Sequence, residues 1–190
     1  MRPTRWLLPL LLAGASFSAF AQDQSRSQHS WQKARKPDPV RGFTTTQFTL
    51  TGRFVDPPRG NVPGAPYILL SCSPSEHGAS AEGRFISGQV QAQTPLKVAF
   101  VEPDEIHGTS YNQEINVEYH VDNEKPQNVQ WPPRSDKTSM SLDKEAAKKI
   151  LRGHELVLSM EEPFESKVVI HFDVPDSTDV LNTCGIRERK

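Results

Sequence analysis

Hydrophobic and polar residues alternate along several short segments of the chain, most regularly at residues 113–122 (QEINVEYHVD). Every second position there is apolar: Ile115, Val117, Tyr119 and Val121. The residues between them are polar or charged. A period of two residues is typical of a strand with one buried face and one solvated face. This segment is therefore predicted to be a half-buried strand.

Six further segments have short apolar or alternating patterns and are separated by residues that favour turns. They are residues 43–55, 67–73, 83–92, 95–102, 154–160 and 166–174. Segment 67–73 is almost continuously apolar, which favours a central place in a sheet. The chain has 190 residues, enough for one core of ordinary size, and its 16 prolines and 11 glycines fit short strands joined by turns. We expect a mainly β fold, a single antiparallel β-sandwich-like domain.

One segment, residues 141–153 (SLDKEAAKKILRG), instead has the spacing of a helix. Its apolar residues recur every three or four positions: Leu142, Ala146, Ile150 and Leu151. Ser141 is a good N-cap residue, and Gly153 supplies a C-terminal stop. The narrow apolar stripe predicts that this one α-helix covers the sheet. A shorter turn or helix is expected at residues 175–184.

The N-terminal residues 1–21 have the features of a signal peptide. Two arginines precede a short apolar stretch, and the small residues Ala19 and Ala21 predict cleavage after Ala21. The apolar stretch is shorter than the roughly 20 residues that a membrane span needs. We expect a periplasmic or secreted protein with no membrane span in the mature chain. Residues 22–42 are interpreted as a flexible polar leader, residues 43–186 as the globular domain and residues 187–190 as a charged tail.

The chain has two cysteines, Cys72 and Cys184. Because thiols persist as disulfides in an oxidising compartment, export predicts that these two residues form a bond. A redox-active pair would more typically have the C-x-x-C spacing, which is absent. The bond is therefore interpreted as structural, joining the end of the fold to an internal strand.

Charge and motifs exclude several classes of function. The formal net charge is −1 and no dense run of lysine or arginine is present, so nucleic acid is not an expected partner. No H-E-x-x-H, G-x-S-x-G or phosphate-binding glycine loop occurs. Ser141 and Lys144 formally match the S-x-x-K element of serine enzymes, but its SDN companion is lacking. Helix capping is the favoured role of Ser141, and no catalytic residue is predicted.

Two histidines with nearby carboxylates are the candidates for a metal site. His120 shares a strand face with Glu118, and His171 shares one with Asp173. If these two strands were neighbours, their nitrogen and oxygen atoms could form a surface metal site. The favoured alternative is that these side chains are solvated polar residues of strand faces. We therefore expect no bound metal and no cofactor.

The order of elements in the second half of the chain carries a resemblance to a known family. The stretches EYHVDNEKPQNVQW, RSDKTSMS and FDVPDSTDVLNTC follow a central strand that ends in a cysteine. Over residues 67–184 the chain resembles the type VI secretion accessory proteins called VasI or TagO, although His120 stands where that family typically has an arginine. The resemblance implies an exported envelope protein that acts beside other proteins, among them envelope or secretion-system proteins.

These observations favour a non-enzymatic binding or accessory module of the cell envelope, associated with type VI secretion. Two alternatives from other classes are a small envelope hydrolase and a surface metal-binding protein. An enzyme should show a concave pocket with convergent polar groups and shifted pKa values. A binding module should instead show an exposed apolar patch or a free strand edge.

Overall fold

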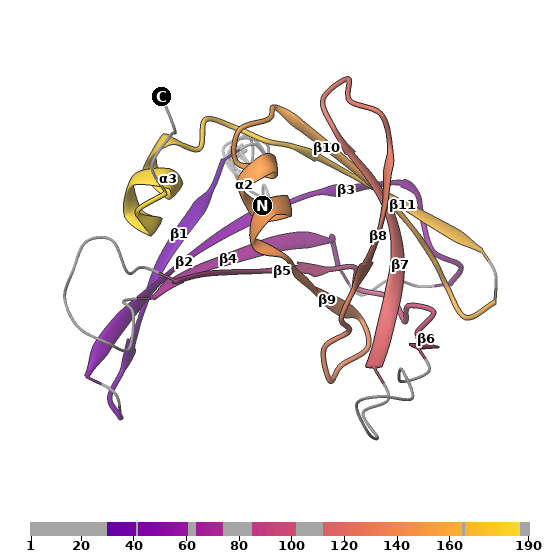
Figure 1. Ribbon diagram of the computed structural model, residues 1–190, viewed down its shortest axis with the longest axis horizontal. Coiled ribbons are helices and arrows are strands. Elements are labelled where there is room, and N and C mark those ends of the chain that lie inside the picture. The colour runs from indigo at the N-terminus through magenta and orange to yellow at the C-terminus, as the bar shows by residue number, and fades with distance from the viewer. Residues whose placement is uncertain are drawn as a thin grey trace, which may run out of the picture.

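Two antiparallel sheets form the described part of the protein, as the computed structural model in Figure 1 shows. The structure describes residues 30–40, 42–60, 64–73, 85–101, 112–164 and 166–186. Sheet A has the order β1 (Gln32–Asp38), β2 (Phe43–Thr51), β4 (Tyr67–Ser73), β5 (Phe85–Gln91) and β9 (Ser139–Leu142). Sheet B has the order β3 (Arg53–Asp56), β11 (Lys167–Asp173), β10 (Glu155–Glu161), β7 (Asn112–Val121) and β6 (Ala99–Val101), and β8 (Gln127–Trp131) also pairs with β7. The expected mainly β, sandwich-like fold class is confirmed.

The hydrophobic core lies between the inner faces of the two sheets. Sheet A contributes alternate residues such as Phe48, Leu70 and Val90, and sheet B contributes Val117 and Ile170. The segment 113–122 behaves as its alternation predicts, because its four apolar residues are all buried. This arrangement leaves the polar side chains of each sheet on an outer face.

Gly52 lets one stretch of chain pass from sheet A to sheet B. It separates β2 from β3, and its N–H donates to the carbonyl of Pro66 at 2.8 Å. A Cβ atom at this position would lie 2.5 Å from Cε1 of Phe172, which is closer than two carbon atoms can approach without a clash. Glycine is therefore needed here for close approach to β11, and the chain can change sheets within a single residue.

The predicted helix is present as α2 (Lys144–Ile150), but it begins later than expected. Ser141 lies in β9, and the N-cap is Asp143, whose carboxylate accepts a hydrogen bond from the N–H of Ala146 at 2.7 Å. The same carboxylate accepts the indole N–H of Trp131 at 3.1 Å. The capping role assigned to Ser141 is therefore wrong, because Asp143 both caps the helix and ties it to β8.

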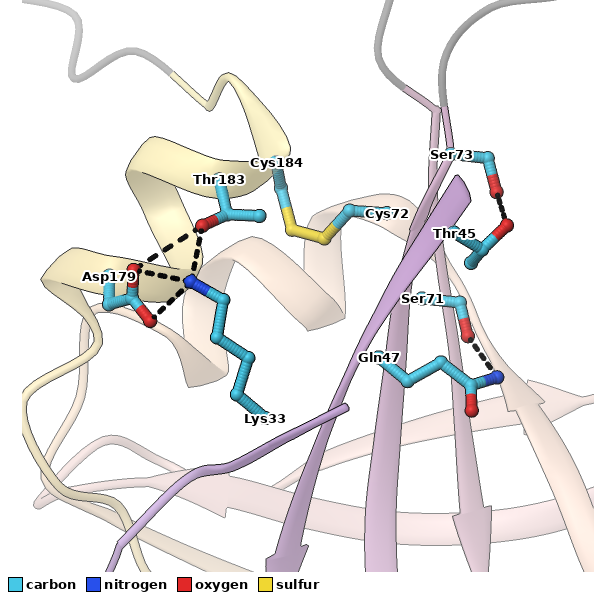
Figure 2. The surroundings of a disulfide bond; sticks show 9 residues. All are labelled: Lys33, Thr45, Gln47, Ser71, Cys72, Ser73, Asp179, Thr183 and Cys184. Carbon is cyan, nitrogen blue, oxygen red and sulfur yellow. Dashed lines mark hydrogen bonds and ion pairs between the residues drawn. A yellow bond between two sulfur atoms is a disulfide. The ribbon is translucent and has the colours of Figure 1, made fainter. Parts of the chain in front are cut away.

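A second helix, α3 (Thr178–Cys184), ends at the cysteine predicted to form a bond. Cys184 is bonded to Cys72 on the inner face of β4, with Cα atoms 5.0 Å apart and a sequence separation of 112 (Figure 2). Lys33 of β1 forms an ion pair with Asp179 of α3 at 3.0 Å. The end of the chain is thus joined to sheet A at two points.

The prediction of a flexible polar leader at residues 22–42 is wrong for β1. This strand pairs with β2 over seven residues, from Gln32 opposite Thr49 to Asp38 opposite Phe43. Just before it, the indole N–H of Trp31 donates to Oγ of Ser177 at 3.1 Å. A polar sequence can form this strand because the side chains of residues 32–37 are exposed at the edge of sheet A, and backbone pairing with β2 holds the strand.

Three other expectations concern the ends of the chain and the membrane. Residues 1–21, the expected signal peptide, and residues 187–190, the expected tail, lie outside the described residues. Neither helix in the described ranges is long and apolar enough to cross a membrane.

Candidate functional site

The outer face of sheet B carries a groove, which we call the sheet B groove. It has a volume of about 470 Å³ and crosses strands β7, β8, β10 and β11. The side chains that give it its polar character are Asn116, Glu118, Asn128, Gln130, Ser159, Glu161 and Lys167. Carboxamides and hydroxyls both donate and accept hydrogen bonds, so this groove can satisfy a partner with polar groups of either kind.

The strand register places these polar side chains side by side. Glu118 of β7 stands opposite Asn128 on one side and Ser159 on the other. Nε2 of Gln130 donates to Oδ1 of Asn116 at 3.4 Å. The groove is therefore a surface built across neighbouring strands, and its shape depends on the rigid sheet beneath it.

An exposed aromatic residue lies in the hairpin turn that joins two residues of the groove lining. Glu161 and Lys167, which both line the groove, are the last paired residues of the β10–β11 hairpin. Phe164 lies in the turn between them, with 82% of its surface exposed. A large apolar side chain beside a polar groove is a common form of anchor for a protein partner.

Glu162 fixes the turn that carries Phe164. Its carboxylate accepts hydrogen bonds from the hydroxyls of Thr94 at 2.7 Å and Ser166 at 2.5 Å, and from the N–H of Arg59 at 3.4 Å. Burial by itself raises the pKa of the Glu162 carboxyl, but these hydrogen bonds outweigh it, and the pKa lies below its usual range. A buried carboxylate thus holds the turn in which Phe164 lies.

The four residues considered for a metal site all lie on the outer face of sheet B. The two strands that carry the histidines are not neighbours, because β10 lies between them and Val157 stands opposite both His120 and His171. The metal site considered from the sequence requires the two histidines to lie on adjacent strands, and the strand register does not place them so. Within the described ranges no group of three His, Cys, Asp or Glu side chains is arranged so that it could hold a metal ion.

His171 differs from the solvated residue that its strand position suggests. Only 8% of its surface is exposed. Its Nε2 atom lies 2.6 Å from Oε1 of Glu155, and its Nδ1 atom lies 3.6 Å from Oδ1 of Asp173. Nη2 of Arg53 lies 3.5 Å from Nε2. His120 is more open, and its Nδ1 atom hydrogen bonds to the carbonyl of Asp122 at 2.9 Å. Both histidines therefore contact protein groups of sheet B or of the residues next to its strands.

A serine paired with a histidine and carboxyls with shifted pKa values are two features of many enzyme sites. Among the residues that the structure describes, no serine side chain hydrogen bonds to a histidine, so the pairing of nucleophile and base is not seen. The carboxyls of Asp136 and Asp176 both have lowered pKa values. Burial by itself raises the pKa of Asp136, but the hydrogen bonds that its carboxylate accepts from Thr138 and Ser139 in a turn outweigh burial, and Asp176 accepts hydrogen bonds from the hydroxyl and the N–H of Thr178. Their shifts therefore arise from turn geometry.

Sequence reasoning identified Glu118 on this face but missed the groove and Phe164. One signal was present: the stretch EEPFES places a proline before an aromatic residue between two apolar strands. Proline between strands marks a turn, and a large aromatic in a turn has no core to enter. The carboxamides gave no signal, because their proximity depends on which strands pair.

Comparison of the chain with protein-family models, curated proteins and solved structures finds no match.

Proposed function

We propose that the protein is an exported, non-enzymatic binding module of the cell envelope that holds a protein partner at the sheet B groove. The observation that carries the proposal is the sheet B groove together with the exposed Phe164 in the turn between Glu161 and Lys167. The hairpin that lines the groove with Glu161 and Lys167 also carries the exposed ring, and an aromatic anchor near hydrogen-bonding side chains is typical of a protein interface.

The partner is expected to be a polypeptide with an apolar pocket for the ring. Phe164 would lose most of its exposed surface in such a complex, which is worth about 2–3 kcal/mol at about 25 cal/mol per Å². The carboxamides of Asn116, Asn128 and Gln130 can pair with the N–H and C=O groups of an extended chain. Because Glu161 pairs with Lys97 at 3.1 Å, one of the two acidic residues of the groove is already neutralised.

Export and a role beside secretion proteins are part of the proposal. The Cys72–Cys184 bond suits an oxidising compartment. The resemblance to VasI or TagO proteins supports a place beside components of a type VI secretion system. The proposal therefore expects the partner among envelope or secretion-system proteins.

Quantitative affinity capture from a native envelope extract tests this function. Three forms of the mature domain serve as bait: the wild type, Phe164→Ala and Val40→Ala. Val40 is the matched control, because it is 92% exposed and lies between β1 and β2 of sheet A. A partner should be recovered with the wild type and Val40→Ala, and at least tenfold less with Phe164→Ala. Equal recovery with all three baits would contradict binding at this groove.

A further inference from the structure

A second cleft lies on the outer face of sheet A, at the edge formed by β9, and we call it the sheet A cleft. Its volume is about 270 Å³. It is lined by strands β4, β5 and β9, by the turn after β8 and by the first residue of α2. The polar side chains in its lining are Ser71, Ser87, Gln89, Arg134, Ser141 and Lys144.

The lining of the sheet A cleft contains two cations and no carboxylate. Arg134 and Lys144 are both exposed, and neither forms an ion pair or a side-chain hydrogen bond with another described residue. Two cations that share a cleft without a counter-charge favour an anion between them. The guanidinium of Arg134 can hold a carboxylate or phosphate by two parallel hydrogen bonds.

The carboxylates nearest in sequence are bound elsewhere, so they do not neutralise this pair. Asp136 accepts hydrogen bonds from the N–H and hydroxyl of Ser139. Asp143 caps α2. Glu145 forms an ion pair with Lys148 at 2.7 Å, and Lys144 helps to lower the pKa of Glu145 without pairing with it. The positive charge of the sheet A cleft is therefore available to a ligand.

Next to the two cations, the outer face of sheet A is formed by uncharged hydrogen-bonding groups. Ser71 stands opposite both Gln47 and Ser87, and Gln89 stands opposite Ser141. Figure 2 shows part of this face, with Gln47, Ser71, Thr45 and Ser73 on the side of the strands away from the disulfide. Hydroxyls and carboxamides donate and accept, as the hydroxyl groups of a sugar require.

We propose that the sheet A cleft binds an acidic sugar, that is, a sugar ring carrying a carboxylate or a phosphate group. Arg134 and Lys144 hold the anionic group, and Ser87, Gln89 and Ser141 bind the ring hydroxyls. The cleft, at about 270 Å³, is larger than a single oxyanion needs, which leaves room for the ring. This site is separate from the sheet B groove, so it does not depend on the function proposed there.

Amide chemical shifts of the ¹⁵N-labelled mature protein test the proposal. The ligands are glucuronate and glucose 6-phosphate, with glucose and inorganic phosphate as the comparison. Both acidic sugars should give saturable shifts at Ser87, Gln89 and Ser141. Glucose or phosphate alone should bind at least tenfold more weakly, because each supplies only one half of the recognised chemistry. Added salt should weaken the binding of the acidic sugars.

Two variants separate the role of the cations from a general effect of charge. Arg134→Gln with Lys144→Gln should lower the affinity for the acidic sugars at least tenfold. Lys36→Gln is the matched control, because Lys36 is an exposed cation of β1 that stands opposite Thr45. The affinity of this variant for the acidic sugars should equal that of the wild type. Circular dichroism and melting curves verify the fold of each variant. The proposal is overturned if neither acidic sugar gives a saturable shift, if phosphate or glucose binds as tightly as they do, or if the double variant binds as the wild type does.

Discussion

Trp31 is the residue whose removal tests most sharply whether the N-terminal segment belongs to the fold. It precedes β1, contacts the hydrophobic core and donates its indole N–H to the buried Ser177. The perturbation is Trp31→Ala in the mature protein. It removes the indole and leaves the backbone pairing of β1 with β2 formally possible.

The expected loss follows from the surface that Trp31 buries. An indole side chain offers about 200 Å², and more than half of this one is covered, so roughly 130 Å² at about 25 cal/mol per Å² gives about 3 kcal/mol. A compact unfolded state lowers that figure to about 2 kcal/mol. The hydrogen bond to Ser177 adds about 1 kcal/mol. We expect a total loss of about 3 kcal/mol in the free energy of unfolding.

Urea unfolding followed by far-UV circular dichroism measures this loss, and a thermal melt should fall by roughly 6–12 °C. Lys33→Ala is the control on the same strand. It removes a partly exposed ion pair with Asp179, which should cost no more than about 1 kcal/mol. A loss below about 0.5 kcal/mol for Trp31→Ala would refute the reasoning, and the segment would then be the dispensable leader that its composition suggested.

Three other predictions concern the disulfide bond, the two histidines of sheet B and Glu162. The double variant Cys72→Ala/Cys184→Ala frees a loop of 112 positions and should lose up to about 5 kcal/mol in urea unfolding, whereas two reactive thiols in the unreduced wild type would contradict the bond. His171→Ala should cost about 1.5–3 kcal/mol because it breaks the contact with Glu155, while His120→Ala should cost less than about 1 kcal/mol; equal losses would contradict the buried role of His171. The folded pKa of Glu162 lies below its unfolded value, so its stabilisation is complete above about pH 4.5 and is lost as the pH falls through the folded pKa. Glu162→Gln should therefore flatten the acid limb of the stability curve, and an unchanged limb would argue against the network.

The parts of the fold that could be predicted from the sequence are those in which a local pattern reflects burial. The alternation at residues 113–122 identified β7, because a strand between a core and solvent repeats every two residues. The expectation of export, together with a lone pair of cysteines, predicted the Cys72–Cys184 bond, which is confirmed. The apolar stripe of residues 142–151 predicted that α2 packs against the sheets, because its apolar positions recur on the buried side of the helix.

The parts that could not be predicted depend on pairing between distant segments. β1 has no apolar alternation, and it is held by its neighbour β2, by Trp31 and by Lys33. The insertion of β10 between β7 and β11 separates the two histidines, and no local pattern encodes the order of strands. The N-cap of α2 is Asp143 and not the predicted Ser141, because β9 extends through Leu142 and pairs with β5.

The most direct test of the central claim is contact between the sheet B groove and a partner protein. A photoreactive phenylalanine analogue placed at position 164, and at position 40 as the control, reports which proteins lie beside each site in the native envelope. The account predicts one discrete crosslinked protein at position 164 that is absent at position 40. No crosslink at position 164, or the same products at both positions, would contradict it.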